Sequence, residues 1–135
     1  MNGEFVDTSA WVAVFDGGDR NHPHAMGHWR ELQDSRTRAY TTDYVIDESI
    51  TLARRRAGHA VAVRLGNVLL ASRVLRLVEV TPAIRQAAWL LFRKYDDKEL
   101  SFTDCTSFVV MEQLGLSEAF AFDEDFSQVG FLRRP

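Results

Sequence analysis

Apolar residues follow two alternating patterns along the chain. Short runs rich in valine, phenylalanine and threonine predict strands, and longer segments with apolar residues three or four positions apart predict helices. The expected strands lie at 5–6, 38–42, 74–81 and 118–122. One helix is expected to begin near residue 8. The other expected helices cover 21–35, 43–56, 59–72, 82–95 and 101–115. This alternation predicts an α/β protein with a central, mostly parallel sheet of four to five strands, flanked by helices.

Proline, glycine and hydroxyl residues mark several of the expected helix ends. Pro23 and Pro82 fall in first turns, where the missing N–H of proline does no harm. Ser101 or Thr103 is expected to cap the helix of 101–115, and Gly115 to end it. These boundaries support the assignment of the segments between them.

Acidic residues stand at the ends of two expected strands. Asp7 follows the apolar pair at 5–6, and Asp123 follows the strand at 118–122. In parallel sheets the ligands bind beyond the carboxyl ends of the strands. Asp7 and Asp123 are therefore expected at the same end of the sheet.

Two further acids occupy apolar helical stripes. Glu48 lies three residues after Val45 and four before Leu52, and Asp104 lies four before Phe108. These spacings place both carboxylates on core-facing sides of their helices. An unpaired carboxylate is costly there, so each requires a cation or several N–H donors.

Each acid alone has a simpler interpretation. Asp7 suits a helix cap, Asp104 a first-turn acid that complements the helix dipole, and Asp123 a turn. Glu48 could pair with an arginine of 54–56. Their joint placement favours a common site, because four converging carboxylates repel one another unless a hard divalent cation joins them.

Composition restricts the class of protein further. A length of 135 residues fits one domain, 1–135, and a single cysteine allows no intramolecular disulfide. The net charge of −3 argues against a general nucleic-acid coating protein, although an enzyme with clustered acids remains compatible with it. No signal peptide and no apolar run of about 20 residues is recognised, so no membrane span is predicted and a cytoplasmic location is expected.

Four segments together resemble a known family. They are FVDTSAW (5–11), TTDYVIDESITL (41–52), SFTDCTSFVVM (101–111) and AFAFDEDFSQVGF (119–131). In this order they resemble the PIN-domain ribonucleases, and most closely the VapC toxins of toxin–antitoxin modules. The resemblance covers almost the whole chain and implies a PIN-like three-layer sandwich.

The family's motif residues carry over position by position. The resemblance implies an acidic quartet of catalytic metal ligands, Asp7, Glu48, Asp104 and Asp123. It implies that hydroxyl side chains support this quartet, and that Asp125 is the alternative to Asp123 as the fourth acid. These supporting residues are Thr8, Ser9, Thr103 and Asp125.

The resemblance also implies an activity and partners. We expect a Mg²⁺- or Mn²⁺-dependent endoribonuclease that hydrolyses RNA phosphodiester bonds and is held in check by a cognate antitoxin. A homodimer is expected as well. His22 and the arginines Arg54, Arg55 and Arg56 are candidates for RNA or partner contact, with a solvated helix end as the alternative for the arginines.

Some residues receive a structural interpretation. His24 and His28 have the spacing of zinc ligands, but without nearby cysteine ligands a solvated helix face is preferred. Cys105 is expected to be a small buried thiol. We assign Trp89, Leu90 and Phe92 to the core, with part of that face available for a dimer contact.

Two other functions compete with the ribonuclease. A phosphatase or phospho-acceptor would use Asp7 as nucleophile, but no second acid stands two residues later and no lysine follows the last strand. A catalytically silent PIN-fold binding module is the other, and the intact quartet argues against it.

Overall fold

A five-stranded parallel sheet forms the centre of the protein. The computed structural model describes residues 3–135, and in it the strands lie in the order β3-β2-β1-β4-β5. Every neighbouring pair of strands is parallel. The strands are β1 (Gly3–Val6), β2 (Arg38–Thr42), β3 (Arg76–Val78), β4 (Glu118–Phe120) and β5 (Leu132–Arg134). All five carboxyl ends therefore point to the same edge of the sheet.

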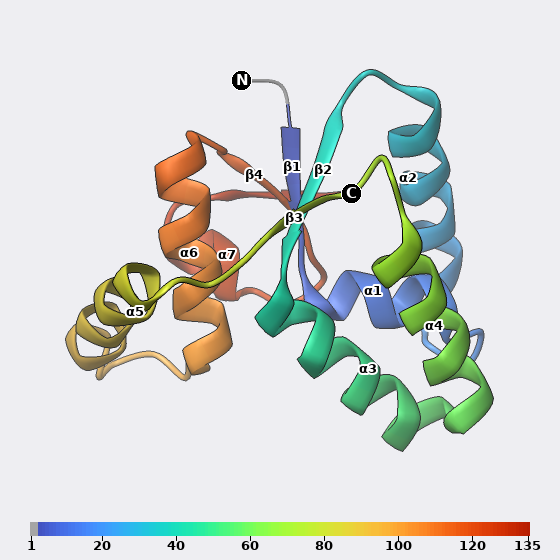
Figure 1. The fold of residues 1–135 in the computed structure, drawn as a ribbon, viewed down its shortest axis with the longest axis horizontal. Coiled ribbons are helices and arrows are strands. Elements are labelled where there is room, and N and C mark those ends of the chain that lie inside the picture. Colours follow the sequence, from blue (N-terminus) through green and yellow to red (C-terminus); the bar gives the residue numbers. More distant parts are fainter. Residues whose placement is uncertain (1–2) are drawn as a thin grey trace.

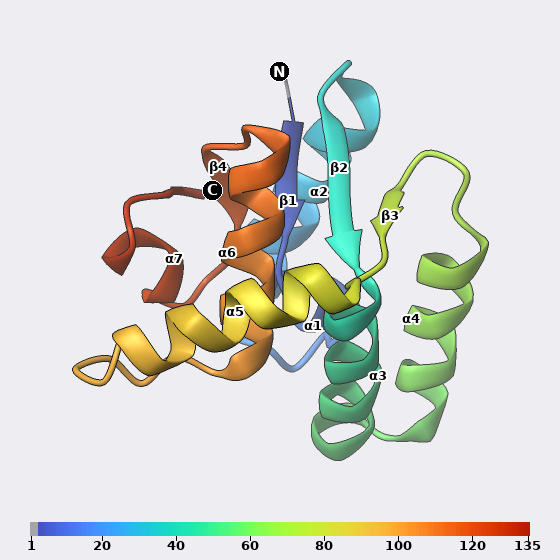
Figure 2. The same cartoon turned by 60° about the vertical axis from the view of Figure 1, so that its left-hand side comes forward.

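Helices cover both faces of the sheet, as Figures 1 and 2 show. In Figure 1, α5 and α6 lie on one side of the sheet, and α1, α2 and α4 on the other. The helices are α1 (Thr8–Phe15), α2 (His22–Asp34), α3 (Asp43–Ala57), α4 (His59–Ala71), α5 (Pro82–Lys94), α6 (Phe102–Leu114) and α7 (Asp125–Gln128). The predicted α/β sandwich is confirmed. No helix in residues 3–135 is both long and apolar enough to cross a bilayer.

Two strands are shorter than their sequence pattern suggests. The segment 74–81 contributes only β3, because the Val80 N–H donates to the Asp43 carboxylate (2.8 Å) instead of to a neighbouring strand. The segment 118–122 contributes only β4, and the Phe122 N–H donates to Ser9 Oγ (3.0 Å). Sequence reasoning did not assign β5 to a segment, since its three residues are exposed and show no alternation.

The assignment of Trp89, Leu90 and Phe92 to the core was wrong. Their exposed fractions are 49%, 56% and 41%. In α5 only Ile84 and Ala88 are buried, so the helix contacts the rest of the protein along one narrow stripe. The remaining face of α5 presents its large apolar side chains to the surface.

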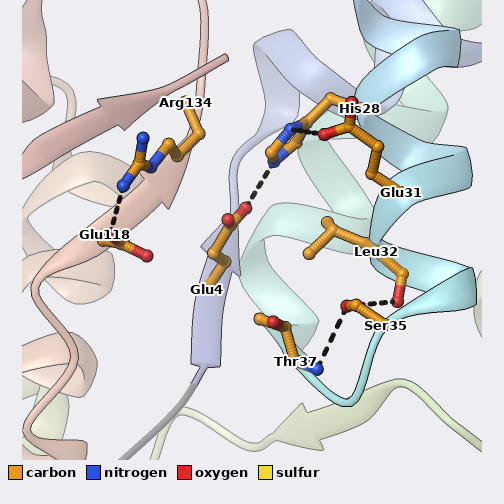
Figure 3. Close-up of polar contacts among 8 residues, drawn as sticks. All are labelled: Glu4, His28, Glu31, Leu32, Ser35, Thr37, Glu118 and Arg134. Carbon is orange, nitrogen blue, oxygen red and sulfur yellow. Dashed lines mark hydrogen bonds and ion pairs between the residues drawn. The ribbon is translucent and has the colours of Figure 1, made fainter.

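The expectation of a solvated His28 was also wrong. His28 is buried, and its Nε2 lies 2.7 Å from Glu4 Oε2 (Figure 3). Its ring also packs edge-on against Phe120, with 4.6 Å between ring centroids. Sequence spacing could not reveal this pair, because the carboxylate stands 24 residues away on β1. His24 on the same helix is exposed.

Candidate active site

Asp7 joins the end of β1 to the start of α1. It is the N-cap of α1, and its Oδ2 accepts hydrogen bonds from the backbone N (3.3 Å) and Oγ (3.0 Å) of Ser9. The side chain is 2% exposed. The cap interpretation of Asp7 is therefore correct, but it accounts for only one of the two carboxylate oxygens.

The second oxygen, Asp7 Oδ1, is buried without a hydrogen-bond donor among the described residues. Burial raises the pKa of Asp7 well above its ordinary value, and the charges of Asp123 and Asp104 raise it further. Asp7 and Asp123 lie close enough to share a hydrogen bond when one of them carries a proton. An orphaned oxygen among other carboxyl groups is a position that a proton or a cation would satisfy.

Asp104 lies in the first turn of α6. Its Oδ2 accepts from the Ser101 N–H (3.1 Å), while its own N–H donates to Ser101 Oγ (3.0 Å), so the two residues form a capping box. Burial raises the pKa of Asp104 to about 8, with a hydrogen bond to Asp125 as the second cause. The capping box fixes the position of the Asp104 carboxyl group, while burial and Asp125 disfavour its charged form.

The segment after β4 brings two more acids to the same place. Asp123 does not directly end the strand as predicted, since β4 stops at Phe120 and the chain turns before reaching it. Asp123 Oδ1 accepts from the Asp125 N–H (3.1 Å), so the two acids share one turn. Burial and the charge of Asp125 raise the pKa of Asp123.

The structure thus brings Asp7, Asp104, Asp123 and Asp125 together, close enough that the charges of these acids raise the pKa values of Asp7, Asp104 and Asp123. Glu48 makes no hydrogen bond to these four acids among the described residues. It is half-buried on α3, and no hydrogen bond or ion pair of its side chain is found in residues 3–135. Its place in the quartet stays a prediction.

The supporting hydroxyl groups differ in their environment. Ser9 Oγ links the two sides of the site, since it donates to Asp7 and accepts from the Phe122 N–H. Thr8 Oγ1 is buried and has no hydrogen-bond partner in the described part of the chain. Thr103 is half-buried, and its carbonyl oxygen accepts from the hydroxyl groups of Thr106 and Ser107.

Other candidates lie away from the acids or are inert. Arg54, Arg55 and Arg56 are exposed in the last turn of α3. His22 Nδ1 contacts the Ala13 carbonyl (2.7 Å), near the end of α1 opposite to Asp7. Burial raises the pKa of the Cys105 thiol to about 11, which fits the expected unreactive side chain.

The sequence did not indicate one residue that lies near the acids. Arg133 on β5 donates from Nη1 to the carbonyl oxygens of Phe122 and Asp123, both at 3.0 Å. Its charge also lowers the pKa of Asp123. The sequence offered no signal for this contact, since it depends on the unassigned strand β5.

The donor set fits a hard divalent cation. Carboxylate oxygens are the ligands that Mg²⁺ and Mn²⁺ prefer, and Asp7 Oδ1 has no other partner. In residues 3–135 no group of three acidic, histidine or cysteine side chains has the geometry to hold a metal ion as it stands. The raised pKa values of Asp7, Asp104 and Asp123 favour their protonated forms, so a cation that binds there would displace protons.

Comparisons with known proteins identify the family of the chain. The family profile described as PIN domain matches residues 5–132. Proteins of Mycobacterium tuberculosis strains CDC 1551 / Oshkosh and ATCC 25618 / H37Rv, both named 23S rRNA-specific endonuclease VapC20, are 40% identical over 128 residues, which is 95% of this chain and 95% of theirs.

A solved structure shows the same architecture. The crystal structure of Mycobacterium tuberculosis VapC20, described as a sarcin-ricin loop cleaving toxin, aligns with a TM-score of 0.91 at 39% identity. The alignment covers 98% of this chain and 100% of that chain. The predicted likeness to VapC toxins is confirmed, and the chain belongs to the PIN-domain family.

Proposed function

We propose that the protein is a metal-dependent endoribonuclease and the toxin of a VapBC-type toxin–antitoxin pair. The observation that carries this proposal is the convergence of Asp7, Asp104 and Asp123 around an orphaned buried oxygen. The likeness to proteins named as 23S rRNA-specific endonucleases indicates the substrate class. We propose RNA as substrate, with 23S ribosomal RNA as the first candidate.

The acids would hold Mg²⁺ or Mn²⁺. Asp7 and Asp104 are the proposed central ligands, and Glu48 with Asp123 or Asp125 completes the set. When bound, the cation supplies positive charge that polarises the phosphodiester and activates water for hydrolysis. Loss of the proton that the raised pKa of Asp104 retains would accompany binding.

The chain's own hydroxyl groups orient these carboxylates. Ser9 holds Asp7 Oδ2, and Oδ1 is left without a hydrogen-bond donor among the described residues. Thr8 Oγ1 has an unused donor next to Asp7 in the chain, and we assign it to a water molecule of the site, because its burial keeps it from direct contact with RNA. The exposed Arg54, Arg55 and Arg56 are the proposed contacts to RNA phosphates or to an acidic partner.

Two protein partners belong to the proposal. A cognate antitoxin would cover the acids and keep the nuclease inactive. A second copy of the chain would bind the exposed face of α5, where Leu90 also lines an apolar hollow of about 530 Å³ between α5 and α6. We place the protein in the cytoplasm, as a single PIN-like domain over residues 1–135.

Controlled expression with sequencing of RNA ends tests this function. We expect growth arrest and new 5′ ends at discrete RNA positions, both absent in D7N and both relieved by the small protein encoded beside the toxin gene. A harmless wild type, or RNA ends identical in wild type and D7N, would refute the proposal. An exposed-acid variant, D47N, is the matched control, because Asp47 lies on the surface of α3.

A further inference from the structure

The segment that carries Asp123 and leads to Asp125, the first residue of α7, has little regular structure of its own. It spans residues 121–124, between the end of β4 and the four-residue helix α7. The hydrogen bonds that hold it therefore decide where the two carboxylates lie. Two contacts hold the backbone of Phe122, one at its N–H and one at its carbonyl oxygen.

Ser9 and Arg133 are the two residues that make these contacts. The Phe122 N–H donates to Ser9 Oγ, and the Phe122 carbonyl accepts from Arg133 Nη1, both at 3.0 Å. The same nitrogen of Arg133 also donates to the Asp123 carbonyl at 3.0 Å. The two N–H groups of one nitrogen thus span two consecutive peptides beside the acids.

The residues on either side of Arg133 are held in place by contacts with the rest of the protein. On the same strand, Arg134 Nη2 lies 2.7 Å from Glu118 Oε1 of β4 (Figure 3), and the Ala121 N–H donates to the Arg134 carbonyl (3.1 Å). Just before β5, the ring of Phe131 stacks on Phe108 of α6, with centroids 5.8 Å apart. The strand is therefore anchored to β4 and α6, and Arg133 reaches the acidic segment from a rigid support.

A positive side chain beside a proposed cation site is unexpected on electrostatic grounds alone. The Arg133 charge repels a divalent cation, so it would weaken metal binding if charge were its only effect. Hydrogen bonds that orient metal ligands act in the opposite direction, and their loss typically lowers metal affinity or activity by about 10–100-fold. The geometry of Arg133 matches the second role.

We propose that Arg133 is a positioning residue, which holds the 122–123 peptides so that Asp123 and Asp125 face Asp7 and Asp104. This inference rests on the proposed metal-dependent nuclease function. It assigns a task to β5: the edge strand serves as the support from which the acidic segment is held in place.

The substitution R133M tests this role, since it removes the donors and keeps most of the side-chain length. Mn²⁺ titration calorimetry of the RNA-free protein should show about 10-fold or greater loss of affinity in R133M. R133K, whose ammonium group also has donors for both carbonyls, should recover most of that affinity. The matched control R36M removes the same charge from an exposed loop residue and should leave Mn²⁺ affinity unchanged.

The sign of the change separates positioning from electrostatics. If R133M binds Mn²⁺ as tightly as the wild type, or more tightly, Arg133 is not a positioning residue. Rates of RNA cleavage give a second readout, in which the defect of R133M should shrink as Mn²⁺ is raised towards saturation. A cleavage defect that Mn²⁺ concentration does not change would likewise overturn the proposal.

Two controls keep the experiment decisive. Metal-free thermal melts confirm that R133M is folded, which its exposed place on an edge strand favours, and the R133K–R133Q comparison replaces R133M if it is not. R133Q should bind Mn²⁺ less tightly than R133K, and equal affinities would overturn the proposal. If the wild type binds no Mn²⁺ and cleaves no RNA, the proposed function fails and the role of Arg133 with it. If the wild type does both and R133M matches it, the function stands and the positioning role fails.

Discussion

The substitution of Asp104 by asparagine should stabilise the metal-free protein above neutral pH. Asparagine keeps the oxygen that accepts from the Ser101 N–H. In place of the second carboxyl oxygen it has an amide NH₂ group that can donate to Asp125. It removes the charge that a buried carboxyl group among other acids must otherwise carry. D104N therefore isolates the electrostatic cost of gathering the acids.

The magnitude follows from the raised pKa. Between pH 3.8 and about 8, the folded protein retains a proton on Asp104 that the unfolded chain releases. The free energy of unfolding of the metal-free wild type should therefore fall as pH rises through this window and level off above it. A gap of roughly four pKa units at about 1.4 kcal/mol each gives an upper bound of roughly 6 kcal/mol, part of which belongs to the coupled acids.

Urea denaturation with a chelator, at several pH values from 5 to 9, measures this effect. The wild type should lose stability with pH, whereas D104N should show a flatter profile and exceed the wild type by a few kcal/mol at pH 8 to 9. The control D47N changes an exposed acid of α3 and should follow the wild-type profile. Added Mn²⁺ should stabilise the wild type and D47N far more than D104N.

A purely structural Asp104 predicts the opposite pattern. Loss of a capping interaction would destabilise D104N by roughly 0.5–2 kcal/mol at every pH and leave the Mn²⁺ response unchanged. That outcome would refute the reasoning that places Asp104 among the metal ligands.

Three further predictions concern single contacts. Of the two aspartates that follow β4, D123N should reduce Mn²⁺ affinity and RNA cleavage more than D125N, because the charge of Asp123 is the first electrostatic cause of the raised pKa of Asp7. Equal or reversed effects in the same assays would contradict the choice of Asp123 as the fourth acid. H28A should lower the free energy of unfolding in urea by roughly 3 kcal/mol, since it removes the hydrogen-bonded partner of the buried Glu4 carboxylate, which then has the charge of Arg134 nearby. A loss below about 1 kcal/mol would show that the pair contributes no more than a surface ion pair. L90E should convert the proposed homodimer to monomer in size-exclusion chromatography with light scattering, and an unchanged mass would exclude the α5 face as the dimer contact.

The fold was predictable because local patterns agree with the tertiary structure. Caps and prolines placed helix starts, as at Ser101 and Pro82, and alternation of strands with helices implied the parallel sheet. The strand β5 was not predictable, since its residues are exposed and its pairing depends on distant β4. The surface position of Trp89 was missed for a similar reason, because helical spacing alone does not show which face a neighbour covers.

The candidate site was predictable only in part. Strand-end position identified Asp7, and an apolar stripe identified Asp104, as buried acids that need a partner. Sequence could not show that Asp7 is both a cap and an acid with one orphaned oxygen, since that depends on the rotamer and on Ser9. Nor could it show Arg133, whose contacts with the acidic segment are made from an unassigned strand.

The central claim is that these carboxylates bind a divalent cation, and anomalous scattering from Mn²⁺-soaked crystals tests it most directly. The account predicts one or two manganese peaks within direct ligand distance of Asp7 and Asp104, with Asp123 or Asp125 directed at them. Strong peaks elsewhere with none at Asp7, or no peak in crystals that diffract well at saturating Mn²⁺, would contradict it.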